Sequence, residues 1–316
     1  MPPAASIEAG IARWLKFVEP ASTLLRVWPL TGGISSVMTA FMISRAGDSK
    51  TLVLRQPSDW SLEHVPDVTC REFNRLGALC GGGLPVPAPI FCAPTGAHFG
   101  RPGLVLEYID GKPELNPSDP SNYVDQFARQ LADIHGFDTS SQGLALAAAP
   151  LHEFARFGVE TMPQAEPSFQ VARSWATLAA NAARQSRNTP VLLHGDFWPG
   201  NTLWRDGALV AVIDWENTRA GDPLLDLSIS RLDICWACGP QAMADFTERY
   251  LAYHPIDTAL LPLWDLCTAL RPVTNIEAWA AAYGPLGRPD ITADTMRQAH
   301  SGFVSQAFDA WRQAGH

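Results

Sequence analysis

A change of periodicity near residue 112 constrains the fold of this chain more than any other feature. Before it, apolar residues come in short runs, at 24–30, 37–44 and 51–55, separated by glycine- and serine-rich segments. Such runs predict β-strands joined by turns. From about residue 122 onward, apolar residues recur mostly at helical spacing. We therefore expect an α+β chain with an antiparallel sheet in its first part and a mostly helical second part.

Further elements follow from the same patterns. In the first part, strands are expected around Ile90 and over 104–108, with helices over 1–18 and from Asp67 to the glycines at 81–83. The second part predicts helices at 122–135, 168–185, 223–237, 240–253, 258–282 and 291–313, around a strand-rich island at 190–215. The break at 110–113 marks the boundary. We predict an N-terminal lobe over 1–112, a hinge near 107–112 and a C-terminal lobe over 113–316.

Composition excludes some classes of function. The 316 residues are 47% hydrophobic, enough for a large core, and the net charge is −9. No basic face is visible, so nucleic acid is not an expected partner. No apolar stretch is long enough to span a membrane. Six scattered cysteines and no secretory signal predict reduced thiols and a cytoplasmic location.

The acidic residues are unevenly distributed. Of the 32 acidic residues 23 lie after Lys112, with 13 of the 23 basic ones. Solubility explains this excess. The alternative is a site that collects metal ions and a cationic substrate.

The segment 191–216 carries the densest group of chemically active residues. An apolar run at 191–193 leads into a loop with Asp196, Asn201 follows five positions later, and a second apolar run leads to Asp214. Phosphoryl transfer needs a carboxylate for the proton of the attacking hydroxyl, and hard oxygen ligands for Mg²⁺. Turn chemistry could explain Asp196 or Asn201 alone. The whole arrangement favours phosphoryl transfer.

These motifs resemble a known family. His194-Gly195-Asp196 with Asn201, followed by Ile213-Asp214-Trp215-Glu216, is similar to the aminoglycoside phosphotransferase and choline kinase superfamily of small-molecule kinases. The resemblance covers nearly the whole chain and implies a protein-kinase-like, two-lobed fold. It implies that Asp196 is the catalytic base and that Asn201 and Asp214 hold Mg²⁺. It also implies that His194 and Asp226 brace the catalytic loop, and we expect His135 to be structural.

The first part resembles the family's nucleotide-binding lobe. A loop with Gly32, Gly33, Ser35 and Ser36 lies between its first two strands. The backbone N–H groups and hydroxyls of this loop could approach phosphate oxygens. The third strand carries Arg55 where the kinase template has a lysine that contacts the α- and β-phosphates. Arginine is a permanent cation that can grip phosphate and carboxylate, so Arg55 is expected to bind phosphate, stabilise transition-state charge and pair with Glu72.

The segment 104–111 resembles the hinge between lobes. There, backbone groups of Glu107, Tyr108 and Ile109 would hydrogen-bond the nucleotide base. Because backbone groups make these contacts, the sequence does not separate ATP from GTP.

We therefore expect an enzyme that uses ATP or GTP to phosphorylate a hydroxyl of a small molecule. Only seven residues separate Asp214 from Asp222, too few for the activation segment of a protein kinase. The acidic, aromatic-rich second part favours an amine-bearing, aminoglycoside- or choline-like acceptor. Because Arg55 replaces the usual lysine, a nucleotide-binding regulator with little turnover is the alternative, and an atypical protein kinase is a third. The sequence identifies neither the acceptor, nor a resistance role, nor the oligomeric state.

Overall fold

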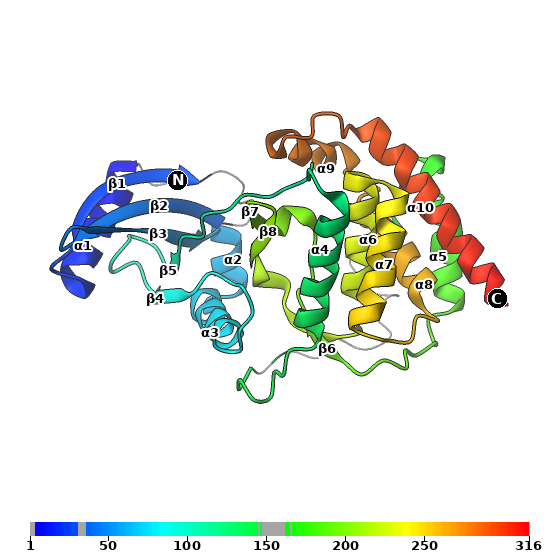
Figure 1. Cartoon of the computed structure of the whole chain (residues 1–316), viewed down its shortest axis with the longest axis horizontal. Coiled ribbons are helices and arrows are strands. Elements are labelled where there is room, and N and C mark those ends of the chain that lie inside the picture. Colours follow the sequence, from blue (N-terminus) through cyan, green and yellow to red (C-terminus); the bar gives the residue numbers. More distant parts are fainter. Residues whose placement is uncertain (1–3, 31–35, 145, 147–161, 165, 316) are drawn as a thin grey trace. The chain divides into compact units, whose positions relative to one another are not determined.

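The computed structural model describes residues 4–30, 36–144, 146, 162–164 and 166–315 (Figure 1). Three residues of the expected phosphate loop, Gly32, Gly33 and Ser35, lie outside these ranges. The chain forms two compact units. The first comprises 1–110 with 142–144, and the second comprises 111–141 with 145–316.

The first unit is built on an antiparallel sheet with the strand order β1-β2-β3-β5-β4. Its elements are α1 (Ala4–Val18), β1 (Thr23–Leu30), β2 (Ser36–Arg45), β3 (Asp48–Pro57), α2 (Asp59–His64), α3 (Val68–Gly81), β4 (Pro89–Ala93) and β5 (Gly103–Glu107). The apolar face of α1 carries Ile11 and Trp14, which are buried in one core with Phe41 of β2. The expected amphipathic helix and the five strands are therefore confirmed.

Two local features of this unit differ from what the sequence favours, namely a helix cap by the Asp67 side chain and no helix before it. Asp67 stands at the N-cap of α3, but its carboxylate does not cap the helix. Asp67 Oδ2 instead accepts a hydrogen bond of 2.8 Å from Arg71 Nε, because a charged guanidinium one turn away is the stronger donor. The short helix α2 was not predicted; its cap is Ser58, whose hydroxyl accepts from Ser61 N–H.

The second unit is mostly helical, with two small sheets, β6–β9 and β7–β8. Its elements are α4 (Pro120–His135), α5 (Val171–Ala180), β6 (Val191–Leu193), β7 (Thr202–Arg205), β8 (Ala208–Val212), β9 (Arg219–Gly221), α6 (Leu224–Cys238), α7 (Pro240–Tyr253), α8 (Leu261–Ala269), α9 (Ile276–Tyr283) and α10 (Ala293–Gln313). Helix α6 is buried along nearly its whole length. It packs against α7, α8 and α10, so it forms the centre of the unit (Figure 1).

The helix predicted over 258–282 is wrong in one important respect, because the structure has two helices there, α8 and α9. The break follows from Pro272: the residue before a proline is disfavoured in helical geometry, and proline has no N–H to continue the ladder. The predicted helix 168–185 likewise ends early, at Ala180.

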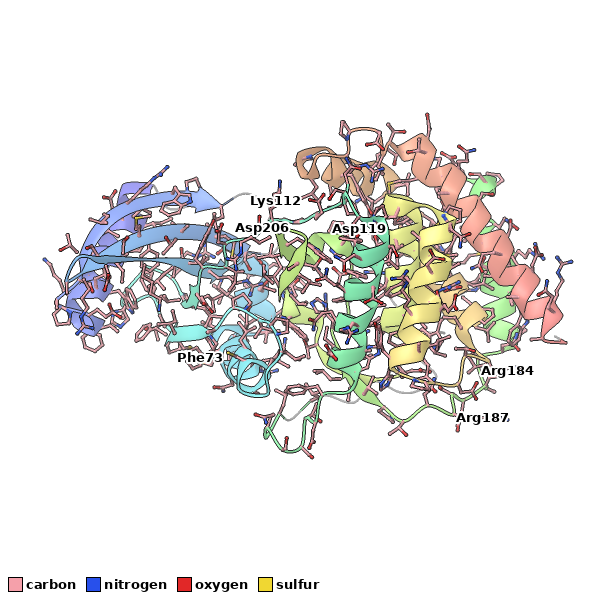
Figure 2. All side chains as sticks on the ribbon, viewed as in Figure 1. Phe73, Lys112, Asp119, Arg184, Arg187 and Asp206 are labelled. Carbon is pink, nitrogen blue, oxygen red and sulfur yellow. The ribbon has the colours of Figure 1, made fainter. Side chains whose placement is uncertain are left out.

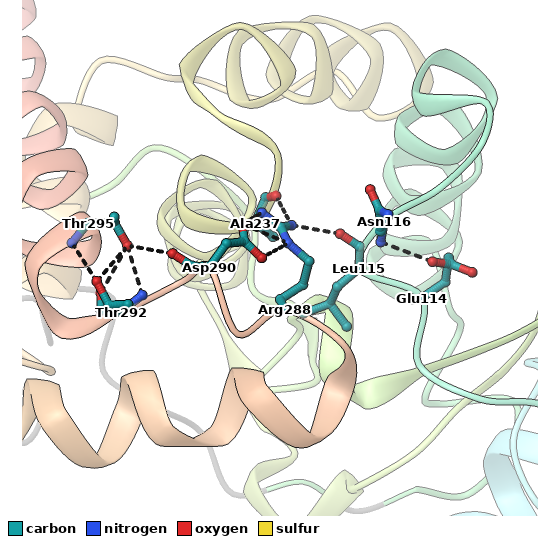
Figure 3. Close-up of polar contacts among 8 residues, drawn as sticks. All are labelled: Glu114, Leu115, Asn116, Ala237, Arg288, Asp290, Thr292 and Thr295. Atoms are coloured by element: carbon teal, nitrogen blue, oxygen red, sulfur yellow. Dashed lines mark hydrogen bonds and ion pairs between the residues drawn. The ribbon is translucent and has the colours of Figure 1, made fainter.

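Polar contacts fix the ends of these elements. Asp119 caps α4 by accepting from Asn122 N–H at 3.1 Å, and Asp206 occupies the tight turn between β7 and β8 with a φ of 51° (Figure 2). Arg288 donates to the carbonyls of Leu115 and Ala237, at 2.8 and 2.5 Å, and pairs with Asp290 (Figure 3). These contacts fasten the segment before α4 to the end of α6.

In the described part of the chain, every helix is too short or too polar to cross a membrane.

Candidate active site

The loop after β6 carries the predicted catalytic residues and depends on one glycine. Gly195 has a φ of +84°, and a Cβ there would lie 2.5 Å from the carbonyl oxygen of Asn217. Only glycine fits this backbone conformation and this close approach. Gly195 therefore lets the loop pack against the turn that follows Asp214.

A buried carboxylate on α6 holds this loop. The carboxylate of Asp226 is fully buried and accepts from the N–H groups of His194 at 2.7 Å and Gly195 at 2.9 Å. His135 Nε2 lies 3.4 Å from the same carboxylate. Burial alone would raise the pKa of Asp226, but these hydrogen bonds and the nearby imidazoles hold the pKa below its usual value. The structural roles expected for Asp226 and His135 fit these contacts.

His194 links the loop to the end of β8. Its Nδ1 accepts from the N–H of Asp196 at 3.3 Å, so the ring proton is on Nε2, which donates to the carbonyl of Ile213 at 2.9 Å. Both ring nitrogens are used within the protein. His194 therefore acts as a brace in this structure, as expected.

Asn201 brings the three predicted polar residues together. Its amide nitrogen donates to the carbonyl of Asp196 at 2.9 Å and to the Asp196 carboxylate at 3.3 Å. The main-chain carbonyl of Asn201 accepts from the N–H of Ile213 at 2.9 Å, and Ile213 directly precedes Asp214. Asp214 has left-handed backbone geometry, with a φ of 65°, at the start of a short 3₁₀ turn. Asp196 and Asn201 thus form one hydrogen-bonded set, and the main-chain contact of Ile213 joins this set to the strand end that carries Asp214.

The donor chemistry of this set fits a magnesium ion held with substrate. Asn201 uses its amide nitrogen for both contacts above, which leaves an amide oxygen for a cation. Asp214 supplies a carboxylate. Among the described residues, no group of three His, Cys, Asp or Glu side chains forms a protein-only metal cage. Mg²⁺ commonly takes one or two protein oxygens and completes its shell with water and phosphate.

One residue in this site was missed by the sequence reasoning. Arg271 Nη2 donates to Asp196 Oδ1 at 2.9 Å, and the two side chains are 20% and 29% exposed. Arg271 lies in the break between α8 and α9, directly before Pro272. An Arg-Pro pair inside an apolar helical pattern was the available signal, since it predicts a helix boundary with a polar residue at it.

The surroundings of Arg271 are aromatic and acidic. Its guanidinium lies 5.4 Å from the ring centroid of Trp279. On α6, Asp233 is buried and accepts from Tyr283 Oη at 3.4 Å. Burial raises the pKa of Asp233 to about 7, an effect that Arg271 opposes and the nearby Asp196 carboxylate reinforces. Asp233 is therefore only partly ionised at neutral pH.

In the first unit, the predicted cation and its acidic partner meet. Arg55 on β3 forms a buried ion pair with Glu72 on α3, so this predicted pairing is confirmed. Ser36 is the first residue of β2. Glu107 ends β5, where its N–H donates to the carbonyl of Ala88 at 2.9 Å. Tyr108 and Ile109 follow outside regular secondary structure, and the nucleotide contacts expected of these residues stay predictions.

The fold and these two polar sets define a phosphotransferase with the architecture of the small-molecule kinases. The family model described as the phosphotransferase enzyme family, APH, matches residues 29–265. This chain therefore belongs to the phosphotransferase enzyme family.

The chain is also similar to known proteins in sequence and in fold. Acyl-CoA dehydrogenase family member 11 of Homo sapiens is 28% identical over 252 residues, which are 70% of this chain and 32% of that protein. The chain thus spans about a third of the length of that relative. Choline kinase LicA from Streptococcus pneumoniae has a TM-score of 0.58 and 19% identity, covering 97% of this chain and 99% of that one. Aminoglycoside phosphotransferase APH(4)-Ia, solved with AMP-PNP and hygromycin B, has a TM-score of 0.60 and 16% identity, covering 94% and 98%.

Proposed function

We propose that this protein transfers the γ-phosphoryl group of a nucleoside triphosphate, in the presence of Mg²⁺, to a hydroxyl group of a small molecule. The observation that carries the proposal is the hydrogen-bonded set of Asp196 and Asn201, which Asp226 braces from α6 and a main-chain contact joins to the strand end before Asp214. The family and the AMP-PNP complex of a structural neighbour support a nucleotide as phosphate donor.

In this mechanism, the carboxylate of Asp196 orients the acceptor hydroxyl and takes its proton. The acceptor oxygen then forms a bond to the γ-phosphorus while the bond from that phosphorus to the β–γ bridging oxygen breaks, which releases the nucleoside diphosphate. Asn201 and Asp214 would hold Mg²⁺, which supplies charge neutralisation to the phosphates when bound. The Asn201 contact fixes the Asp196 carboxylate in position for the proton.

The first unit is proposed to bind the nucleotide. Arg55, fixed by Glu72, would contact phosphate oxygens and stabilise the charge of the transition state. The phosphate loop, with Gly32, Gly33, Ser35 and Ser36, and the hinge backbone at Glu107, Tyr108 and Ile109 keep the roles that the sequence predicted. The lobe boundary near 107–112, and ATP or GTP as the donor, are part of the same proposal.

The class of acceptor has evidence on both sides. Two structural neighbours, an aminoglycoside phosphotransferase and a choline kinase, support the amine-bearing acceptor expected from composition. The contact of Arg271 with Asp196 opposes it, because it puts a cation beside the proposed base.

The test is ADP release from Mg-ATP across a panel of hydroxyl compounds, with wild type beside Asp196→Asn. We expect one acceptor to drive turnover, and the variant to lose about 10²- to 10⁴-fold in kcat, the range typical of a general base. Its nucleotide affinity should hardly change. Asp206→Asn, in the exposed β7–β8 turn, is the matched control and should behave as wild type. Equal turnover by Asp196→Asn and wild type would refute the assignment of the base.

A nucleotide-binding regulator is the second candidate, and two observations favour it. Arg55 replaces the lysine of the kinase template, and Arg271 engages one oxygen of the Asp196 carboxylate. Tight Mg-ATP binding with no acceptor-stimulated ADP release would support this candidate over the enzyme.

A further inference from the structure

Arg271 places a cation at the proposed base, Asp196. Arg271 reaches Asp196 because the chain leaves α8 at residue 269 and does not resume a helix until Ile276. In the structure its guanidinium lies at the carboxylate that would take the acceptor's proton. Any acceptor hydroxyl placed on Asp196 must therefore come close to a permanent positive charge.

The acidic side chains that could offset this charge do little to help a cationic acceptor. The Asp196 carboxylate is already paired with Arg271. Asp233 is buried, and Tyr283 Oη donates to it. Glu277 on α9 pairs with Arg297 at the surface. These three carboxylates of the described chain thus do not supply an ammonium site beside the base.

The geometry points to an acceptor that carries an anionic group, a carboxylate or a phosphate ester, near the hydroxyl that is phosphorylated. Resting on the proposed function, we assign Arg271 as the residue that binds this group and so selects the acceptor. A guanidinium forms paired hydrogen bonds with carboxylate and phosphate oxygens, whereas it repels an ammonium. The guanidinium lies 5.4 Å from the ring centroid of Trp279, within the range of a cation–π contact. Binding the anion there would place the adjacent hydroxyl at Asp196.

The experiment uses the full chain with Mg-ATP and sets of acceptors that share a carbon skeleton and differ in one charged or neutral substituent. One set is glycerate, glyceramide and 3-amino-1,2-propanediol; another is glycerol 3-phosphate and glycerol; a third is glucose 6-phosphate and glucose. Wild type is expected to prefer an anionic member over its neutral partner by about 100-fold or more in kcat/KM, because a site built to bond a polar group rejects the analogue without it. The two anionic groups appear in separate sets, so carboxylate and phosphate are distinguished.

Variants separate anion binding from base positioning. Arg271→Gln should abolish the preference mainly by raising the KM of the anionic acceptor, and Arg271→Lys, which keeps the charge without the fork, should restore part of it. Arg312→Gln is the control, because Arg312 is exposed on α10 and pairs there with its helix neighbour Asp309. Thermal melts of all variants check folding. A loss of kcat that is equal on every acceptor, with KM unchanged, would make Arg271 a positioning residue and overturn the inference.

A binding readout covers the case in which no panel member is phosphorylated. With Mg-ADP present, malonate at millimolar concentration should raise the melting temperature of wild type and of Arg312→Gln but not of Arg271→Gln. If the chain binds Mg-ATP, yet no anionic compound stimulates ADP release or stabilises it through Arg271, the inference fails and the proposed function stands. If the chain does not bind Mg-ATP, both fail.

Discussion

At the scale of single residues, the ion pair of Arg55 and Glu72 shows what the sequence could predict. The strand position of Arg55 and the helix position of Glu72 were both readable, and one contact joins them in the structure. Both side chains are buried. Removing one member of a buried ion pair lowers the unfolding free energy by about 3 to 5 kcal/mol, because it leaves the other charge without its partner.

Glu72→Gln should therefore lower the unfolding free energy of the first unit by about 3 kcal/mol. It should also raise the KM for the nucleotide. Chemical denaturation and steady-state kinetics measure the two effects. Glu63→Gln on α2, whose side chain is exposed, is the control and should change neither. An unchanged nucleotide KM in a folded Glu72→Gln variant would remove Arg55 from the phosphate site.

Asp214 gives a second prediction at this scale. If Asp214 and Asn201 hold Mg²⁺, Asp214→Asn removes the only carboxylate of that pair and should raise the Mg²⁺ concentration needed for half-maximal turnover by about tenfold or more. Binding of Mn²⁺ to the enzyme with ATP, followed by electron paramagnetic resonance, reports the same loss without turnover. A variant with wild-type ion dependence in both measurements would show that the metal is held elsewhere.

At the scale of elements, α6 supports the catalytic loop through its first turn. The Asp226 carboxylate accepts from two successive backbone N–H groups of the loop. An amide in its place has one acceptor oxygen, so Asp226→Asn leaves a buried donor without a partner, at a cost of about 1 to 3 kcal/mol. We expect lower stability and a clear fall in kcat, with little change in nucleotide KM.

Urea unfolding and steady-state kinetics test that expectation against Asp309→Asn, an exposed position on α10. A destabilised Asp226→Asn variant with wild-type kcat would mean that the brace serves only folding.

Elements also mark where sequence reasoning stops. Apolar periodicity predicted the strands of the first unit and most helices of the second, because burial of one face determines those patterns. It joined α8 and α9 into one helix, since the apolar spacing continues past Pro272. The contact of Arg271 with Asp196 spans 75 positions in sequence, and no local pattern encodes such a contact. The sequence therefore placed Asp196 and Asn201 in one loop, where the structure joins them by hydrogen bonds, but it did not indicate that Arg271 borders them.

At the scale of the whole molecule, bulk charge is a poor guide to the site. The chain has a net charge of −9, and this acidity suggested a cationic acceptor. Beside the proposed base, however, the structure places a cation, together with a carboxyl group whose pKa burial raises to about 7. Position and burial decide the local field, because buried pairs interact more strongly than charges spread over the surface.

The raised pKa of Asp233 makes stability depend on pH in a defined direction. An unfolded aspartate ionises near pH 3.9, whereas the folded Asp233 does so at about 7, with Arg271 opposing and Asp196 reinforcing the effect of burial. Between these values the native chain keeps a proton that the unfolded chain has released. Stability contributed by this group therefore falls as pH rises from about 4 to about 7, by at most about 1.4 kcal/mol per pH unit, and levels off above.

Asp233→Asn cannot ionise and should lack this slope. Urea unfolding of both proteins at several pH values from about 6 to about 8.5 gives the difference in their unfolding free energies. The contributions of the titratable groups that the two proteins share cancel in this difference. Wild type should lose stability relative to the variant up to about pH 7 and then run parallel to it. A difference that is constant over the whole range would mean that Asp233 ionises below about pH 6 in the fold. In that case a full negative charge would stand near Arg271, and the balance of charge at the acceptor site would shift toward an amine.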